Sequence, residues 1–569
     1  MEYNFVFRTR IILIAVAFSV LVIVCRLYYV QIIKGEVYRS KAENQYIKPS
    51  TQGSDRGSIF FTLKNGDKIA VATMKQSYNI SINTKDIKNI DQVYDALTQY
   101  IDIDENEFKE KVAKKENSYF DLLKKLDTAT GQSIASLRIP GVVALQESYR
   151  VYPADSLSSH TIGLTGFDKN NLLAGRYGLE SYYEVALSRK SAQNSINFFA
   201  EIFSDLRKTV LNLESVEGDI VSTIEPTVAS YLEKTISDTR DKWKSDSIGG
   251  IIMDPNTGEI YAMSKLPNFN ANNLSDIKDA KIFSNSLVED SYEMGSIIKP
   301  LTMAIGIDSG VIKANSTYND EGSLNLNSRK ISNYDGKARG IIAMQEVLSQ
   351  SLNVGAATIA LKTGPENFTE YFLDLGLGEK TGIDQPNEQK GIIKNLLTKR
   401  EIEVATASYG QGISMTPIQT VTALATLANG GNLVRPHIIK SIEYTNGNSN
   451  TIAINSKRVF QESSVKDVTN MLINVVDKAL KKGDVKMEHY SIAAKTGTAQ
   501  IADPVKGGYY KDRYLHSFFG YFPAYNPKFI IFLYHIYPKG AEYASETLTD
   551  PFIQLTKLLI NYYEIPPDR

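Results

Sequence analysis

Residues 292–300 of the chain read Tyr-Glu-Met-Gly-Ser-Ile-Ile-Lys-Pro, and an apolar run follows them. Ser296 and Lys299 are three positions apart, so on a helix their side chains share one face. A serine hydroxyl is a weak nucleophile until a base takes its proton, and a lysine can be that base where burial or a neighbouring cation lowers its pKa. Pro300 is tolerated only in the first turn of a helix, and a helix N-terminus favours a developing anion. The stretch therefore predicts a nucleophilic Ser296 at a helix start, with Lys299 as its base.

Spacing alone does not single out Ser296, because Ser-x-x-Lys also occurs at residues 275–278 and 463–466. Only Ser296 is preceded by glycine and followed by an apolar run that predicts a helix over residues 295–309. A second pattern, Ser-x-Asn, places Ser351 and Asn353 in a helix-like or helix-turn stretch. A hydroxyl there can relay a proton to a leaving amine while the amide orients a substrate. Other Ser-x-Asn pairs, interpreted as surface or capping pairs, lie at 77–79, 195–197 and 323–325.

Lys-Thr-Gly occurs three times, so the pattern alone cannot identify a functional copy and the sequence around each copy must decide. The copy at 362–364 stands where a predicted helix ends, so its glycine is interpreted as a C-cap. The copy at 380–382 lies in a glycine-rich turn. The copy at 495–497 lies inside a strand-like run. A strand that lines a cleft can present a cation, a hydroxyl and backbone N–H groups to an extended peptide, and glycine leaves room for close approach. Context therefore selects the third copy.

The remaining pattern predicts an α+β protein with a central antiparallel sheet flanked by helices. Residues 55–72 contain two β-like runs around Asn65-Gly66, a hairpin signal, and residues 86–138 look helical and charged. A strand, a turn and a second strand are predicted over residues 248–264. Further helices are predicted over 343–361, 417–429 and 551–562, and closing strands over 489–501, 515–522 and 528–537.

Length, charge and composition exclude several classes of protein. A chain of 569 residues is too long for one ordinary domain. Lys and Arg number 63 against 64 Asp and Glu, so no global field favours nucleic acid. The single cysteine, Cys25, excludes a disulfide framework inside the chain, and the five histidines form no ligand spacing. We therefore predict no metal site, no cofactor and no nucleic-acid partner.

The N-terminus predicts a membrane anchor. Residues 11–25 are an uninterrupted apolar run, and Arg8 and Arg10 precede it. The run extends to residue 33 with interfacial tyrosines, long enough for one tilted span. No small-x-small cleavage site follows, so an uncleaved anchor is favoured over a signal peptide. We expect residues 1–10 in the cytoplasm, residues 11–33 in the cytoplasmic membrane as a single pass, and the rest of the chain outside it.

The ordered set of Ser296-x-x-Lys299, Ser351-x-Asn353 and Lys495-Thr496-Gly497-Thr498 resembles the penicillin-binding transpeptidases. Further stretches resemble the same family, and those of the first half resemble the pedestal of its class B, monofunctional branch. Met294 departs from the family, which usually has proline there. The resemblance implies an elongated, β-rich pedestal of the penicillin-binding protein dimerisation type over residues 34–240 and a transpeptidase domain, like a serine β-lactamase, over 241–569. The stretches are 56–59, 150–153, 178–180, 254–263, 407–412, 416–419 and 428–431.

The family resemblance also implies roles for these residues. Ser296 is then the acyl-ester nucleophile and Lys299 its general base, while Ser351 and Asn353 relay a proton and orient the substrate. Lys495 and Thr498 hold the terminal carboxylate of the donor, next to Thr496 and Gly497. Backbone N–H groups of Ser296 and Thr498 form the oxyanion hole, each worth about 3 kcal/mol. The implied substrates are peptidoglycan stem peptides, a D-Ala-D-Ala donor and an amine acceptor, with covalent inhibition by β-lactams.

Several alternatives share part of the pattern. A β-lactam sensor or a β-lactamase-like hydrolase has the same motifs, but the chain has no separate Glu-x-x-Leu-Asn, and the large pedestal fits poorly. A catalytically weak scaffold that activates a membrane glycosyltransferase is a second alternative, against which the complete motifs argue. The resemblance implies a multi-spanning glycosyltransferase and divisome proteins as partners in any case. Residues 518–524 and 561–567 favour the septal, division-type branch over the elongation type.

Overall fold

The computed structural model describes residues 55–113, 119–169, 172–189, 217–503 and 505–569. Within these ranges the chain forms two compact units, a smaller one of residues 76–149 and a larger one that contains the rest. The predicted anchor, residues 11–33, lies outside the described residues. Among the described helices, none is both long enough and apolar enough to cross a membrane. The boundary predicted after residue 240 stays a prediction, and helix α10 (Pro226–Trp243) runs across it inside the larger unit.

The smaller unit packs helices against strands around its own core. The second half of β3 (Lys68–Asn83) pairs antiparallel with β4 (Tyr119–Leu126). The predicted helical region over residues 86–138 was wrong where β4 lies, because pairing with β3 overrides the charged composition of that strand. The unit also contains α3 (Ile90–Leu97), α4 (Glu105–Ala113), α5 (Thr128–Ser136) and most of β5 (Val142–Val151), with a core built around Ile80, Ile82, Val93, Leu97, Phe108 and Ile134.

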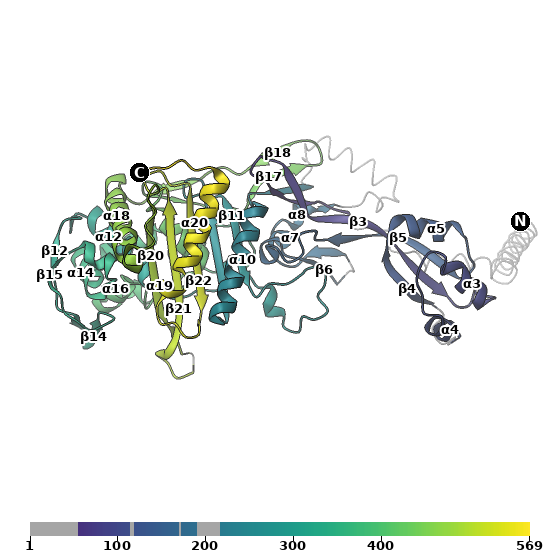
Figure 1. The fold of residues 1–569 in the computed structure, drawn as a ribbon, viewed down its shortest axis with the longest axis horizontal. Coiled ribbons are helices and arrows are strands. Elements are labelled where there is room, and N and C mark those ends of the chain that lie inside the picture. Colours follow the sequence, from purple (N-terminus) through teal and green to yellow (C-terminus); the bar gives the residue numbers. More distant parts are fainter. Residues whose placement is uncertain (1–54, 114–118, 170–171, 190–216, 504) are drawn as a thin grey trace, which may run out of the picture. The chain divides into compact units, whose positions relative to one another are not determined.

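The larger unit is built on one five-stranded sheet, which confirms the predicted central antiparallel sheet (Figure 1). The spatial order is β11-β10-β22-β21-β20, and every neighbouring pair is antiparallel. The strand that carries the third Lys-Thr-Gly, β20, lies at one edge of this sheet. The strands are β10 (Ser247–Met253), β11 (Ile260–Leu266), β20 (Ala493–Ala502), β21 (Tyr509–Phe522) and β22 (Phe529–Ile536).

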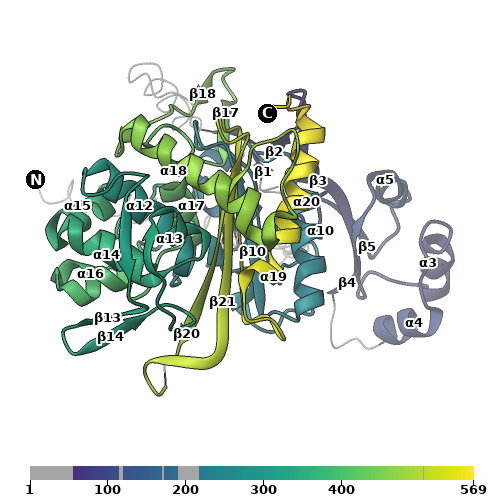
Figure 2. The ribbon, with the colours of Figure 1, turned by 60° about the vertical axis from the view of Figure 1, so that its left-hand side comes forward.

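Helices cover both faces of the sheet (Figure 2). Helices α10 and α20 (Thr549–Tyr563) lie on one face, and a larger helical layer lies on the other. This layer carries the N-terminal turn with Ser296 against the edge strand. It consists of α11 (Ser286–Glu289), α12 (Lys299–Asp308), α13 (Gln345–Ser349), α14 (Asn353–Thr363), α15 (Pro365–Asp374), α16 (Glu401–Ala407), α17 (Pro417–Ala425) and α18 (Glu462–Asn474).

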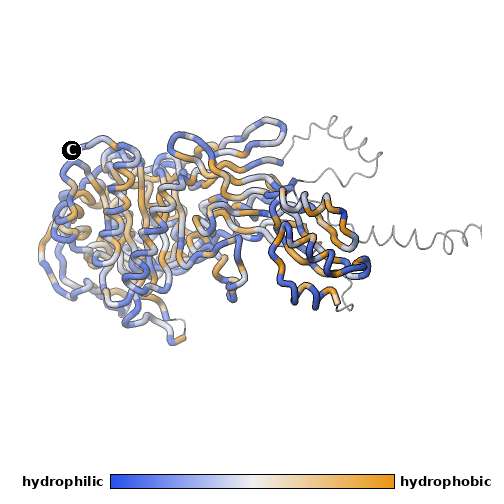
Figure 3. The backbone as a smooth tube through the Cα atoms, turned by 45° about the vertical axis from the view of Figure 1, so that its right-hand side comes forward, coloured by the Kyte–Doolittle hydropathy of each residue, from blue (hydrophilic) through white to orange (hydrophobic). Residues whose placement is uncertain are grey.

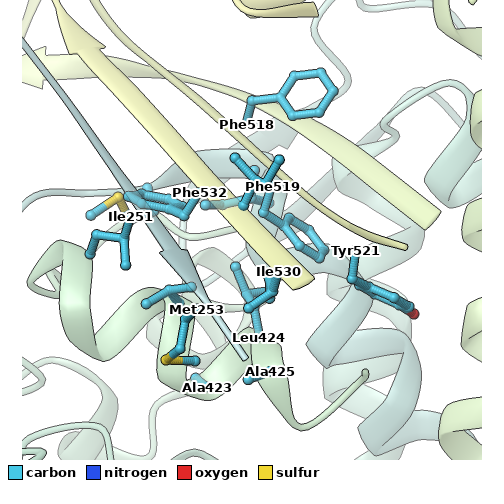
Figure 4. Close-up of a cluster of buried hydrophobic side chains, with 14 of the residues drawn as sticks. Ile251, Met253, Ala423, Leu424, Ala425, Phe518, Phe519, Tyr521, Ile530 and Phe532 are labelled. Atoms are coloured by element: carbon cyan, nitrogen blue, oxygen red, sulfur yellow. The ribbon is translucent and has the colours of Figure 1, made fainter. Parts of the chain in front are cut away.

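The core of the larger unit fills the space between sheet and helices. Hydrophobic stretches run through the middle of this unit, while hydrophilic segments lie at its surface (Figure 3). Figure 4 shows Met253, Ile530 and Leu424 together, where two central strands meet helix α17. Phe518 points to the other face and stacks on Phe552 of α20 with ring centroids 4.6 Å apart. Buried side chains therefore hold helices to both faces of the sheet.

One predicted helix is two helices in the structure. The pattern predicted a helix over residues 343–361, but α13 ends at Ser349 and α14 begins at Asn353. Ser351 has φ 57° in the break, a left-handed conformation that few non-glycine residues adopt. The apolar periodicity continues across the break, so the pattern could not reveal it.

The predicted hairpin around Asn65-Gly66 is confirmed, because β2 (Ile59–Thr62) pairs antiparallel with the start of β3. In the larger unit, β2 also pairs with β9 (Gly218–Ser222), and β9 pairs with β17 (Ile439–Tyr444). Short elements complete the unit: β1 (Asp55–Arg56), β6 (Thr165–Phe167), β7 (Leu173–Gly175), β8 (Ser188–Arg189), β12 (Thr317–Asp320), β13 (Ser323–Leu326), β14 (Arg329–Ser332), β15 (Gly340–Ala343), β16 (Asn432–Val434), β18 (Ser449–Thr451), β19 (Ser456–Arg458), α6 (Ser159–Ile162), α7 (Gly178–Tyr182), α8 (Glu184–Leu187) and α19 (Ala544–Thr547).

Three stretches of the first half meet at one buried carboxylate. Glu180 accepts from Arg56 Nε at 2.6 Å and from Arg150 Nε at 2.7 Å, and all three side chains are almost fully buried. Arg56 also pairs with Glu184 at 2.8 Å, and Arg150 donates to the carbonyl of Gly57 at 2.7 Å. This cluster ties β1, the last residues of β5 and α7 together within the larger unit.

Candidate active site

Ser296 lies in the first turn of a helix, as predicted. A 3₁₀ turn, Gly295–Ile298, leads directly into α12, and Pro300 occupies the first turn of that helix. Gly295 has φ +66°, and a Cβ at this position would lie only 2.9 Å from the carbonyl oxygen of Thr498. Glycine therefore lets the turn with Ser296 lie directly against the edge strand β20.

Lys299 is buried beside Ser296, with only 1% of the residue exposed. Its Nζ lies 3.0 Å from Ser296 Oγ and 3.2 Å from Ser351 Oγ. It also donates to the carbonyl oxygen of Ser351 at 2.6 Å and to Asn353 Oδ1 at 2.8 Å. One amine thus joins the first two motifs of the sequence.

Burial lowers the pKa of Lys299 well below its usual value, and the charge of nearby Lys495 lowers it further. A neutral amine has two N–H groups and one lone pair. The carbonyl of Ser351 and Oδ1 of Asn353 can only accept, so they take both N–H groups. The lone pair is then left for a hydroxyl donor, and Ser296 Oγ lies at 3.0 Å. The geometry can remove the proton of Ser296.

Ser351 bridges two lysines. Its Oγ lies 3.2 Å from Lys299 Nζ and accepts from Lys495 Nζ at 3.1 Å. The left-handed backbone of Ser351 points both its hydroxyl and its carbonyl toward Lys299. Strained residues of this kind persist where surrounding contacts hold them, often at functional sites. The arrangement can pass a proton from one side of the site to the other.

Asn353 begins α14 and holds Lys299 rather than facing outward. Its Nδ2 donates to the carbonyl of Ser332 at 3.0 Å, while its Oδ1 accepts from Lys299. The next N–H of the helix, that of Val354, donates to Asn333 Oδ1 at 3.1 Å. Asn333 Nδ2 in turn donates to both carboxylate oxygens of buried Asp320, each at 3.0 Å.

Sequence reasoning missed Asn333 and Asp320, which support the second motif from behind. Neither is part of a recognisable pattern, and each is placed by contacts distant in sequence. Asp and Asn are rarely fully buried without partners, but burial is not visible in the sequence, so no sequence signal marks these two residues.

Lys495 is the charged member of the third motif. Burial lowers its pKa to about 7, and its Nζ donates to Ser351 Oγ and, at 2.9 Å, to the carbonyl of Thr496. Lys495 and Gly497 are buried, whereas Thr496 and Thr498 alternate with them and are partly exposed. A Cβ on Gly497 would lie 2.5 Å from Ser517 Oγ, so glycine is required there for packing.

The backbone of Thr498 faces outward from the sheet edge. Its carbonyl points to Gly295, whereas the carbonyl of Gly497 points inward and accepts from Ser517 Oγ at 3.3 Å. In a strand the N–H and C=O of one residue point to the same side. The N–H of Thr498 therefore points toward the turn that carries Ser296, where an oxyanion could form.

The structure brings together every residue of the predicted site, and it places the other two Lys-Thr-Gly copies elsewhere. Thr363 ends α14, and Gly364 follows as its C-cap with φ +85°. In the second copy, the Thr381 hydroxyl donates to Glu388 at 2.6 Å. Among the residues that the structure describes, no group of three or more His, Cys, Asp or Glu side chains could hold a metal ion.

Comparison with known proteins agrees with this geometry. Residues 248–554 match the penicillin-binding protein transpeptidase domain, and residues 51–201 match the penicillin-binding protein dimerisation domain. Stage V sporulation protein D of Bacillus subtilis is 28% identical over 94% of this chain and 82% of its own length. Peptidoglycan D,D-transpeptidase FtsI of Escherichia coli K12 is 24% identical over 97% of this chain and 90% of its own length.

Solved structures share the fold. Penicillin binding protein 2X from Streptococcus thermophilus has a TM-score of 0.74 at 20% identity, over 89% of this chain and 80% of that one. Penicillin binding protein 3 from Mycobacterium tuberculosis, complexed with aztreonam, has a TM-score of 0.67 at 20% identity, over 91% of this chain and 98% of that one. The transpeptidase match covers more than half of the 569 residues and contains all three motifs. The chain therefore belongs to the penicillin-binding protein transpeptidase family and is a penicillin-binding serine transpeptidase.

Proposed function

We propose that the chain is a class B peptidoglycan D,D-transpeptidase that cross-links stem peptides through an acyl-enzyme on Ser296. The observation that carries the proposal is the contact of 3.0 Å between Ser296 Oγ and the buried amine of Lys299. This amine has a lowered pKa, and both of its N–H groups have acceptors. A neutral base in contact with a hydroxyl is what nucleophilic activation requires.

In the acylation half, Ser296 Oγ attacks the carbonyl carbon of the penultimate D-Ala, and its proton passes to Lys299 Nζ. N–H groups of Ser296 and Thr498 stabilise the oxyanion, each by about 3 kcal/mol. The amide C–N bond then breaks, and the terminal D-Ala leaves as an amine. Ser351 Oγ supplies the proton for this amine and regains one from Lys299. Asn353 keeps Lys299 in place throughout.

In the second half, the amine of another stem peptide attacks the ester carbonyl. The proton of this amine returns through Ser351 and Lys299 to Ser296 Oγ as the ester C–O bond breaks. Lys495 and Thr498, next to Thr496 and Gly497, hold the terminal carboxylate of the donor. A β-lactam acylates Ser296 in the same way, but its leaving nitrogen stays tethered, so the adduct persists.

The proposal extends to the place of the enzyme in the cell. Residues 11–33 anchor the chain in the cytoplasmic membrane with residues 1–10 inside, and the described residues lie outside that membrane. Residues 34–240 form the pedestal and 241–569 the transpeptidase domain. We propose a division-type role with a multi-spanning glycosyltransferase and divisome proteins as partners. Support comes from relatives named FtsI and from the match to a dimerisation domain.

The test is a transpeptidation assay with the full-length chain in detergent, a donor stem peptide that ends in D-Ala-D-Ala, and an acceptor amine. We expect release of D-Ala together with the donor–acceptor product, and neither with Ser296→Ala. Release of D-Ala with only hydrolysed donor indicates a hydrolase. If folded wild-type protein gives neither D-Ala nor the donor–acceptor product, but stimulates a glycosyltransferase partner, the protein is a scaffold and the proposal is overturned.

A further inference from the structure

Two buried histidines lie on β21 and β22, the two strands that follow the edge strand β20 in the sheet, and they take no part in the proposed reaction. His516 of β21 is directly opposite Thr498 of β20, and His535 of β22 is directly opposite His516. Residues directly opposite one another in antiparallel strands share a face of the sheet. The two imidazoles are fully buried, with ring centroids 5.2 Å apart.

Hydrogen bonds link both histidines through one threonine. Thr547 Oγ1, in the short helix α19, lies 2.9 Å from His516 Nδ1 and 2.9 Å from His535 Nε2. His516 Nε2 lies 3.1 Å from the carbonyl oxygen of Glu542, and His535 Nδ1 lies 2.8 Å from Ser245 Oγ. Five residues therefore form one continuous chain of contacts.

The carbonyl oxygen of Glu542, at one end of this chain of hydrogen bonds, determines the direction of every bond in it. Burial lowers the pKa of His516 to about 4, so its imidazole is neutral near pH 7. The carbonyl of Glu542 can only accept, so His516 Nε2 carries the one proton and His516 Nδ1 is an acceptor. Thr547 must then donate to His516 Nδ1, which leaves its oxygen to accept from His535 Nε2–H. Thr547 also lies 3.4 Å from the carbonyl of Ala544, a longer contact that cannot compete with the one at 2.9 Å. Ser245 completes the chain by donating to His535 Nδ1.

This chain ends at the segment that contacts Thr498. Glu542 and Thr547 flank Ala544, and the N–H of Ala544 donates to Thr498 Oγ1 at 3.1 Å. A hydroxyl that accepts from a backbone N–H is left with its own proton free to donate in another direction. Anchoring both sides of Ala544 therefore sets which way the Thr498 hydroxyl donates.

We propose that His516 and Thr547 are positioning residues: through the N–H of Ala544 they orient the Thr498 hydroxyl as a donor to the terminal carboxylate of the acyl donor. The inference rests on the proposed function, in which Thr498 binds this carboxylate. The inference predicts that this chain of hydrogen bonds affects the recognition of the terminal carboxylate. It should leave the attack of Ser296 on the donor carbonyl unchanged.

The experiment compares two thioester donors with the full-length protein, one with a free terminal carboxylate and one with a methyl group in its place, which cannot accept a hydrogen bond. Thr547→Val keeps the shape of the side chain and removes both hydrogen bonds. We expect it to slow acylation by the carboxylate donor about tenfold, the loss expected for a misdirected hydrogen bond to a charged group. Acylation by the methyl donor, which has no acceptor for the Thr498 hydroxyl, should stay within about twofold of wild type. Thr547→Ser keeps the hydroxyl and should restore the rate with the carboxylate donor.

A double-mutant comparison gives a second test. In a Thr498→Val background the oriented hydroxyl is absent. Adding Thr547→Val should therefore cause no further loss of acylation rate with the carboxylate donor. Equal slowing of acylation by both donors in Thr547→Val would overturn the inference. So would a further loss of acylation rate when Thr547→Val is added to Thr498→Val. Either result would show that the hydrogen bonds of His516 and Thr547 are only structural. If Thr547→Val does not accumulate as folded protein, His516→Asn carries the same comparison. Acylation that survives in Ser296→Ala would instead overturn the proposed function.

Discussion

The Nζ of Lys299 lies 3.0 Å from Ser296 Oγ, and the surrounding residues exclude solvent from this amine. The contact follows from the i, i+3 spacing, but its chemistry follows from burial. A lysine in water is protonated near neutral pH and cannot accept a proton. Desolvation and the neighbouring charge of Lys495 lower the pKa of Lys299 and turn the same residue into a base.

The pH dependence of acylation should be bell-shaped. Lys299 must be neutral to act as the base, so the second-order rate constant for acylation falls as pH drops through its lowered pKa. The cation of Lys495 holds the donor carboxylate, so the rate also falls as pH rises above about 7, the pKa of Lys495. The two lysines are coupled, and the limbs report the pair. Stopped-flow acylation over a pH series measures both limbs, and a rate that climbs steadily to the pKa of an ordinary lysine contradicts this account.

Two replacements of Ser351 distinguish the backbone strain at this residue from the role of its hydroxyl. The φ of 57° costs a non-glycine residue roughly 1–2 kcal/mol, a penalty that glycine avoids. We expect Ser351→Gly to unfold at a higher urea concentration than Ser351→Ala, the reverse of the usual order for these residues. Both variants lack the hydroxyl between the two lysines, so both should lose about 10²–10⁴ in transpeptidation rate. Equal stability of the two variants would show that the backbone at 351 is not strained.

Gly295 and Gly310 form a matched pair for the close approach of the Ser296 turn to β20. Both have positive φ, but only a Cβ at 295 meets another atom, the carbonyl of Thr498 at 2.9 Å. Each change to alanine should cost about 1–2 kcal/mol of unfolding free energy through backbone strain. Only Gly295→Ala should also slow acylation, by about 10²-fold, because it displaces Ser296 from the N–H of Thr498. Acylation at the wild-type rate in folded Gly295→Ala would argue against that oxyanion hole.

The carboxylate of Glu180 should be essential for the stability of the larger unit. Glu180→Gln leaves Arg56 and Arg150 buried with half of their compensating charge removed, which typically costs about 3–5 kcal/mol. The matched control is Asp238→Asn, which breaks an exposed pair with Lys234 and should leave stability unchanged. Urea denaturation followed by tryptophan fluorescence compares the two, since Trp243 lies in α10 of the same unit. Similar midpoints for both variants would contradict a structural role for the cluster.

The local part of the site could be predicted from the sequence. Ser296 and Lys299 share a helix face through spacing alone, and the strand-like context of Lys495 distinguished it from two other Lys-Thr-Gly copies. The central antiparallel sheet was predictable in part because strands such as β22 are short apolar runs.

Features that depend on distant contacts could not be predicted. Ser351, in the break between α13 and α14, contacts Lys299 and Lys495, which are far away in sequence. Strand β4 carries Lys124 and Lys125 and looks helical until β3 pairs with it. The support of α14 by Asn333 likewise exists only in the folded chain.

The most direct test of the central claim is the intact mass of the full-length protein before and after exposure to benzylpenicillin, with Ser296→Ala and Lys299→Met in parallel. The account predicts that wild type gains the mass of one benzylpenicillin, that the adduct maps to the peptide with Ser296, and that it persists for hours. Ser296→Ala should gain nothing, and Lys299→Met should react about 10²–10⁴ times more slowly although it stays folded. An adduct of equal mass on Ser296→Ala, or wild-type reaction rates in Lys299→Met, would contradict the account.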